Sequence, residues 1–121
     1  MPDVNFILLY VDSPAASAAF YENLLDGPPV ENSPTFAMFA MKSGIMLGLW
    51  KRDGVEPAAQ PGTFGGELAF AVESAAAVSA LHAEWSAKAL TIAQQPTRMD
   101  FGFTFTALDP DGHRLRVFAP G

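Results

Sequence analysis

The chain repeats itself at about half its length. Residues 6–21, FILLYVDSPAASAAFY, align with residues 67–82, ELAFAVESAAAVSALH, so that the second copy starts 61 residues after the first in a chain of 121. The alignment places Val11 on Val72 and Ser13 on Ser74, with alanines and apolar residues matched around them. A fixed internal repeat means that one structural unit is built twice, so the fold must be one that two similar halves can form.

Each copy is predicted to begin as a strand and continue as a helix. Ser13 and Ser74 lie where an N-cap residue is expected, and Pro14 suits the first helical turn, where its missing N–H costs nothing. Apolar residues follow each serine at helical spacing: Ala16, Phe20 and Leu24 in the first copy, and Val78, Leu81 and Trp85 in the second.

The residues after each helix are predicted to form strands. Aligning Gly44 with Gly112 superposes IMLGLW on HRLRVF, so the two copies also end alike. We therefore predict an α+β fold of two βαβββ modules, at about residues 1–50 and 67–121, joined by a linker at 51–66 within a single domain, 1–121. The predicted strands after the helices are 35–41, 45–50, 91–95, 101–108 and 113–118, with DPDG as the last turn.

The alternation along each strand predicts two different faces. One face carries regular aliphatic residues, such as Leu9, Leu49 and Val117, and should cover the helix of its module. The opposite face, called here the open face, mixes aromatic, small and charged residues. Buried charges are costly unless paired, so this face is more typical of a binding surface than of a core. Its predicted members are Phe6, Leu8, Tyr10, Met46, Gly48 and Trp50, and Glu67, Ala69, Ala71, Arg114, Arg116 and Phe118.

The sequence resembles the vicinal oxygen chelate superfamily, which contains glyoxalases, bleomycin-resistance proteins and extradiol dioxygenases. The resemblance lies in the repeated βαβββ pattern, in AFYENLL after the first strand, in GGELAFAVE at the start of the second module and in the terminal DPDGHRLRVF. It covers essentially the whole chain. It implies sheets curled into half-barrel cups, paired in a homodimer whose cup can combine strands from two subunits.

In metal-dependent relatives, the resemblance implies four inward His or Glu ligands for a divalent ion. Their positions correspond to Phe6, Gly48 (or Leu47), Glu67 and Arg116 in this chain. Of these residues, only Glu67 offers an oxygen, and an arginine repels a cation. We therefore predict no metal site, no cofactor and no catalytic residue.

Three of the residues on the open face are the leading candidates for ligand binding. Glu67 and Arg116 are predicted to approach one another, either as a structural ion pair that lets the sheet close or as a polar contact for a ligand. Trp50 lies beside Gly48, which should leave room for a flat ring to stack on the indole; alternatively, Trp50 packs on the linker or on a subunit interface.

Several further residues are weaker candidates. The phenylalanines Phe6, Phe39, Phe64, Phe101 and Phe103 could line the site, with Gly48 among them on the open face, and Asp100 could place a carboxylate at its mouth. His82 and His113 have no evident acid or metal partner in their motifs, and Asp109 and Asp111 are explained by the DPDG turn.

The composition argues against several classes of partner. A net charge of -6 with seven basic residues disfavours nucleic acid and membrane surfaces, and the lack of cysteine excludes disulfides and thiolate chemistry. The first residues, MPDVNFILLYVD, have no basic region and too short an apolar run for a signal peptide, so a cytoplasmic protein is expected.

The leading functional hypothesis is binding or sequestration of a small, planar, largely apolar molecule, similar to the antibiotic-binding, metal-independent branch of the superfamily. The first alternative is a metal-dependent lyase, isomerase or dioxygenase that uses displaced ligands. The second is an interaction module with no small ligand.

Overall fold

The computed structural model describes residues 5–56, 58–59, 62 and 66–121. The chain divides into two compact units, Met1–Gly62 and Thr63–Gly121. Each unit contains one helix and a four-stranded mixed sheet, in the order strand, helix and three strands. The predicted α+β fold of two βαβββ modules is therefore confirmed. The assignment of both units to one domain stays a prediction.

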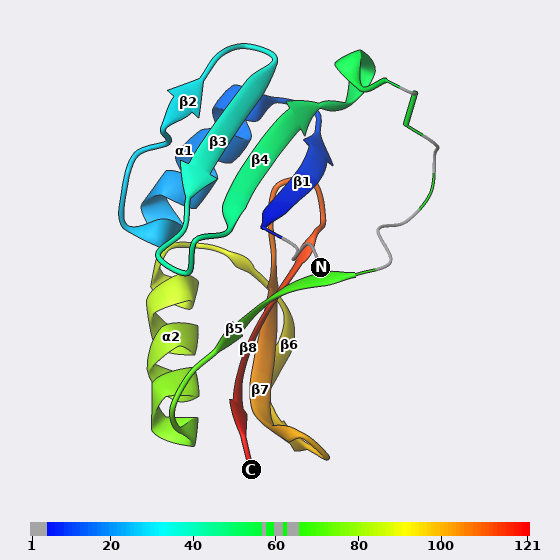
Figure 1. Cartoon of the computed structure of the whole chain (residues 1–121). Helices are drawn as coiled ribbons and strands as arrows, with labels where there is room; N and C mark the ends of the chain where they lie inside the picture. The colour runs from blue at the N-terminus through cyan, green and yellow to red at the C-terminus, as the bar shows by residue number, and fades with distance from the viewer. Residues whose placement is uncertain (1–4, 57, 60–61, 63–65) are drawn as a thin grey trace, which may run out of the picture. The chain divides into compact units, whose positions relative to one another are not determined.

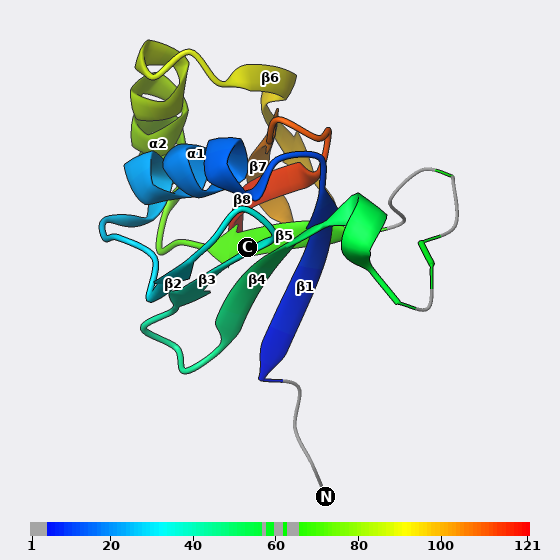
Figure 2. The same ribbon diagram turned by 90° about the horizontal axis from the view of Figure 1, so that it is seen from above.

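The first unit has the strand order β1-β4-β3-β2. Its β1 and β4 are parallel, whereas β3 is antiparallel to both β4 and β2. Figures 1 and 2 show α1 lying along one face of this sheet. The elements are β1 (Phe6–Val11), α1 (Pro14–Leu25), β2 (Glu31–Asn32), β3 (Phe36–Ala40), β4 (Met46–Lys51) and a 3-10 turn, η1 (Arg52–Gly54).

The second unit repeats this arrangement with the order β5-β8-β7-β6. Again the first and last strands are parallel, and the other neighbours are antiparallel. Within the described residues, neither α1 nor α2 is long and apolar enough to cross a membrane. The elements are β5 (Glu67–Ala71), α2 (Ala75–Ala87), β6 (Thr91–Met99), β7 (Gly102–Leu108) and β8 (Arg114–Pro120).

Both predicted helix caps are present. The Ser13 hydroxyl accepts a hydrogen bond from the Ala16 N–H at 3.2 Å, and the Ser74 hydroxyl accepts one from the Ala77 N–H at 3.1 Å. Each cap satisfies one of the N–H groups that a helix leaves unpaired in its first turn, which typically contributes about 1 kcal/mol.

The predicted division into two sheet faces is also confirmed. Leu9 and Leu49 of the first sheet and Leu115 and Val117 of the second are almost fully buried on the helix side. On α2, Trp85 packs edge-on against Phe70 and Phe105, with ring centroids 5.6 and 5.4 Å apart. The exposed members of the open face, such as Leu8 at 43% exposure, lie on the other side.

Two strands differ from the sequence prediction. The short β2 was not predicted, and β6 continues to Met99 although the prediction ended it at Gln95, before Pro96. Proline has no N–H to donate to a neighbouring strand, so it is disfavoured inside a sheet. However, β6 is the edge strand, and its pairing with β7 shifts register between Gln94 and Thr97, so no ladder bond from Pro96 is required.

Gly102 allows the backbones of β7 and β8 to approach closely. Its φ of +144° is one that other residues rarely adopt, and an added Cβ would collide with the Ala119 carbonyl oxygen. Because the position of a Cβ is fixed by the backbone and the carbonyl oxygen is itself a backbone atom, no side-chain rotation can relieve this collision.

We expect Gly102→Ala to lower the free energy of unfolding by about 3 kcal/mol, from strain at φ and from the collision. Urea denaturation followed by circular dichroism measures this. Gly27→Ala is the matched control, because a Cβ at Gly27 meets nothing within 4 Å. Equal losses in the two variants would contradict the prediction.

Candidate functional site

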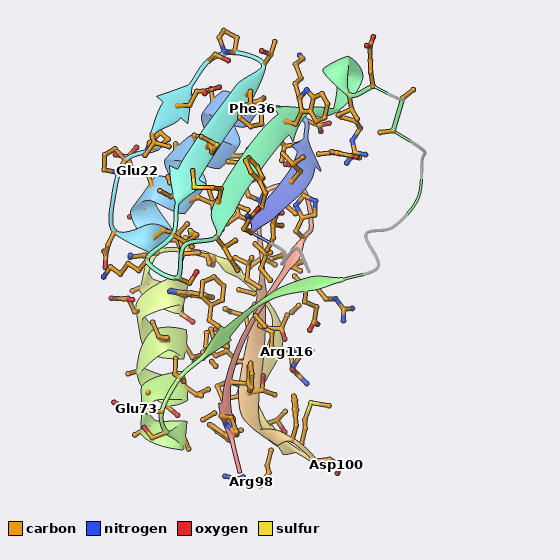
Figure 3. The ribbon with its side chains drawn as sticks, viewed as in Figure 1. Glu22, Phe36, Glu73, Arg98, Asp100 and Arg116 are labelled. Atoms are coloured by element: carbon orange, nitrogen blue, oxygen red, sulfur yellow. The ribbon has the colours of Figure 1, made fainter. Side chains whose placement is uncertain are left out.

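A pocket of about 470 Å³ opens on the second unit. This volume is within the range of pockets that hold drug-sized ligands, roughly 300–1,000 Å³. Figure 3 shows Arg116 projecting from the side of the sheet that faces away from α2, which is the open face. The pocket is lined by Glu67, Met99, Phe101, Arg116 and Phe118.

The strand register brings these residues together. Arg116 and Phe118 are two residues apart on β8 and therefore share its open face. The parallel β5 places Glu67 opposite Arg114. Arg114 is two residues from Arg116 on the same face of β8, so Glu67 lies close to Arg116 as well. Met99 and Phe101 belong to the end of β6 and the turn into β7. Two edge strands, β5 and β6, one central strand, β8, and one hairpin turn thus build the pocket.

Glu67 and Arg116 form a two-pronged ion pair, as the sequence predicted. Arg116 Nε donates to Glu67 Oε1 at 2.8 Å, and Nη2 donates to Oε2 at 3.0 Å. These hydrogen bonds hold the pKa of Glu67 below its ordinary value of 4.5, although partial burial acts in the opposite direction. They also raise the pKa of Arg116. Both groups are therefore charged at neutral pH.

The rest of the Arg116 guanidinium is also engaged. Its Nη1 donates to Gln94 Oε1 at 3.1 Å and to Thr104 Oγ1 at 3.2 Å. The same Gln94 oxygen accepts from Thr106 Oγ1 at 3.2 Å, and Thr104 Oγ1 donates to the Val117 carbonyl at 2.8 Å. This network ties Arg116 to all the strands of its sheet, so the structural reading of the ion pair is supported; its contact with a ligand stays a prediction.

Aromatic side chains form the apolar part of the pocket. The Arg116 Cζ atom lies 5.7 Å from the centre of the Phe101 ring, within the range of a cation–π contact. Phe101 and Phe118 pack edge to face, with centroids 5.9 Å apart. Phe101 and Met99 remain 41% and 45% exposed, so both offer apolar surface to a ligand.

The first unit corrects one expectation. Gly48 was predicted to leave room for a ring beside Trp50, but that space is filled: a Cβ on Gly48 would lie 2.7 Å from Leu8 Cδ2, 2.9 Å from Phe6 Cε1 and 3.0 Å from Phe36 Cζ. Phe36 belongs to this face because it pairs with Trp50 across β3 and β4, and it is labelled in Figure 3. The Trp50 indole is half-buried and packs edge-on against Tyr10, with centroids 6.3 Å apart.

Two of the predicted lining residues lie on the wrong side of their sheets. Phe39 is 3% exposed, pairs with Leu47 and packs against Tyr21 of α1, so it belongs to the core. Phe103 is two residues from the buried Phe105 and therefore shares its helix-facing side of β7. Asp100 is exposed at the tip of the β6–β7 hairpin (Figure 3), and Phe64 lies outside the described residues.

Comparison with known proteins assigns the family. Residues 3–117 match the glyoxalase/bleomycin resistance protein/dioxygenase superfamily. The chain belongs to this superfamily. The phenazine antibiotic resistance protein EhpR of Enterobacter agglomerans is 29% identical over 116 residues, which is 93% of this chain and 88% of EhpR.

Two solved structures carry the same fold. Protein ATC0852 from Agrobacterium tumefaciens, solved by NMR, is 51% identical with a TM-score of 0.87, covering 100% of this chain and 99% of that one. A glyoxalase/bleomycin resistance protein/dioxygenase family enzyme from Burkholderia phytofirmans is 19% identical with a TM-score of 0.84, covering 99% of this chain and 100% of its own. The latter shows the fold alone.

The residues present do not fit the divalent metal that some members of the superfamily use. Among the residues that the structure describes, no three His, Cys, Asp or Glu side chains are grouped closely enough to hold a metal ion. Glu67 is the one oxygen ligand at the expected positions, and both of its carboxylate oxygens already accept from Arg116. A divalent ion at Glu67 would also meet the positive charge of the guanidinium.

Part of the site and one buried pair were not predicted from the sequence. Met99 was missed because the predicted strand ended at Gln95, whereas β6 continues to Met99. Gln94 lies inside the predicted strand but was not named as a candidate. His113 does have an acid partner: its Nδ1 lies 2.6 Å from Asp109 Oδ2, and Asp109 Oδ1 accepts from the backbone N–H of His113 at 2.8 Å. Both side chains are buried, so this pair holds the DPDG turn closed; the acid four residues before the histidine was the available signal.

The pKa of Glu67 predicts how stability depends on pH. Because the folded-state pKa is depressed, the pair stabilises the fold above the unfolded value near 4.5, and this contribution is lost as the pH falls through the lower folded value. We expect Glu67→Gln to cost less than about 1 kcal/mol at pH 7, since the pair is partly exposed to solvent. In urea denaturation, the difference from wild type should shrink below pH 4.5.

Glu84→Gln, at an exposed position on α2, is the control for loss of one negative charge. A difference between wild type and Glu67→Gln that stays constant from pH 7 to pH 3 would show that the ion pair does not contribute through ionisation.

Proposed function

We propose that the protein binds and sequesters a small, planar, largely apolar molecule, as in antibiotic resistance, without metal chemistry. The observation that supports this most directly is the pocket itself. Its apolar lining of Met99, Phe101 and Phe118 surrounds one ion pair whose groups are already held by hydrogen bonds. Such a surface suits ring stacking and apolar contact, and it lacks the set of ligands that an activated metal would need.

The relationship to EhpR supports the same class of ligand. Its name associates that protein with resistance to phenazine antibiotics, and phenazines are flat, fused aromatic molecules. At 29% identity, EhpR indicates a class of ligand to test first. We further propose that the protein acts as a homodimer in the cytoplasm; the family resemblance supports the dimer, and the lack of cysteine suits a reducing compartment.

Trp50 is a separate proposed contact in the first unit. Its indole remains partly accessible. Trp85, the other tryptophan, lies on the core side of α2 and is 3% exposed. Quenching of tryptophan fluorescence by a ligand in direct contact would therefore report on Trp50.

The role of the pocket is tested by titrating the protein with phenazine in an isothermal calorimeter. We expect Phe101→Leu to weaken binding about fivefold to tenfold, because leucine retains bulk but loses the aromatic face. Phe103→Leu is the matched control, because it makes the same change on the helix-facing side of β7, whereas Phe101 lies in the turn before that strand and lines the pocket. If the two variants bind equally well, phenazine does not use this pocket.

The role of Trp50 is tested by fluorescence. If Trp50 stacks on the ligand, phenazine should quench the emission of the wild-type protein, and Trp50→Ala should weaken binding about tenfold. Unchanged affinity in Trp50→Ala would remove Trp50 from the site. The absence of both quenching and calorimetric binding across a panel of planar antibiotics would contradict the proposed function.

A further inference from the structure

We propose that the pocket prefers a planar aromatic ligand bearing an amino N–H donor over the same ring bearing a carboxylate. This inference rests on the proposed function and specifies the chemistry of its ligand. It follows from counting which hydrogen-bonding groups of the pocket are already occupied.

The donors of Arg116 are almost all engaged. A guanidinium has five N–H groups, and four of them have partners: one from Nε, two from Nη1 and one from Nη2. A carboxylate is bound strongly when two parallel N–H groups of one guanidinium face it. Here Glu67 already occupies that position. A carboxylate on a ligand would meet one remaining N–H and would have to displace Glu67 to gain a second.

Among the residues that the structure describes, by contrast, only half of the acceptor positions of Glu67 are used. An ionised carboxylate offers about four acceptor positions, and Arg116 fills two of them. The side chain of Glu67 is 30% exposed and lines the pocket. An amino group on a ring lying against Phe101 and Phe118 can therefore donate to Glu67 without breaking any existing bond. Hydrogen bonds to an ionised group are also stronger than those between neutral groups.

Arg114 is the other cation near the pocket that a ligand carboxylate could bind. It lies on the same face of β8 and opposite Glu67 in register, and it is exposed. However, it is not among the residues that line the pocket. A carboxylate that reached Arg114 would have to extend beyond the aromatic surface of Phe101 and Phe118, where the ring would lie.

The experiment compares three probes by calorimetry at pH 7: phenazine, 2-aminophenazine and phenazine-2-carboxylate. We expect 2-aminophenazine to bind about tenfold more tightly than phenazine-2-carboxylate, with phenazine in between. If none of the three binds, this inference is overturned for phenazines, and the proposed function itself fails if the panel of planar antibiotics does not bind either. If all three bind equally, the proposed function stands and this inference is overturned. A preference for the carboxylate also overturns it, and loss of that preference in Arg114→Gln would identify Arg114 as the cause.

Glu67→Gln gives a second, independent result. The substitution removes the ionised acceptor and releases an N–H of Arg116, so 2-aminophenazine should bind several-fold more weakly and phenazine-2-carboxylate several-fold more tightly. A purely structural role for Glu67 would weaken both probes together, and that outcome would overturn the inference. Glu84→Gln, with the same change of charge on α2, should alter neither. If Glu67→Gln does not fold, the order of affinities of the three probes for the wild-type protein tests the inference alone.

Discussion

The hydrogen-bonded guanidinium of Arg116 is the constraint on which the open face of the second sheet depends. It connects Glu67 on β5, Gln94 on β6 and Thr104 on β7 to its own strand, β8. A positive charge on a largely apolar surface would be unfavourable without such partners. Because all four strands contribute or receive a bond, the position of the charge is determined by the whole sheet. The aromatic rings of Phe101 and Phe118 then lie around a polar centre that is already neutralised.

This pair also restricts the chemistry that the fold can perform here. Where the superfamily resemblance implies metal ligands, this chain has a carboxylate held by a cation. Replacing a divalent ion with a guanidinium keeps the positive charge but removes the open coordination positions that would polarise a substrate. The proposed binding therefore relies on apolar contact, stacking and a small number of hydrogen bonds. The free acceptor positions of Glu67 therefore become the most specific polar feature of the pocket.

The sequence predicted the backbone better than it predicted the surface. The repeat located both modules, and the serine caps and strand alternation assigned the helix side of each sheet. These features depend on local geometry, which period and capping report directly. What fills a space depends on contacts between strands. The alternation pattern predicted an empty space above Gly48, although the rings of Phe6 and Phe36 and the Leu8 side chain fill it. Phe39 and Phe103 were placed in the site by residue type, whereas register assigns them to the helix side.

The two halves show how one backbone plan produces two different surfaces. Leu8 pairs with Gly48 in the first sheet, and the repeat-related pair in the second is Ala69 with Arg116. Each pair combines one small and one large residue, but the large one lies on the outer strand in the first sheet and on the inner strand in the second. In the first sheet, the Leu8 side chain on the edge strand covers Gly48 and fills the space above it. The large cation on the inner strand, Arg116, is hydrogen-bonded to partners on both sides, so it forms a polar centre on the second face. The repeat therefore specifies the fold, and the exchange of size and charge at this one pair distinguishes an apolar face from a pocket with a hydrogen-bonded polar centre, which we propose selects the ligand.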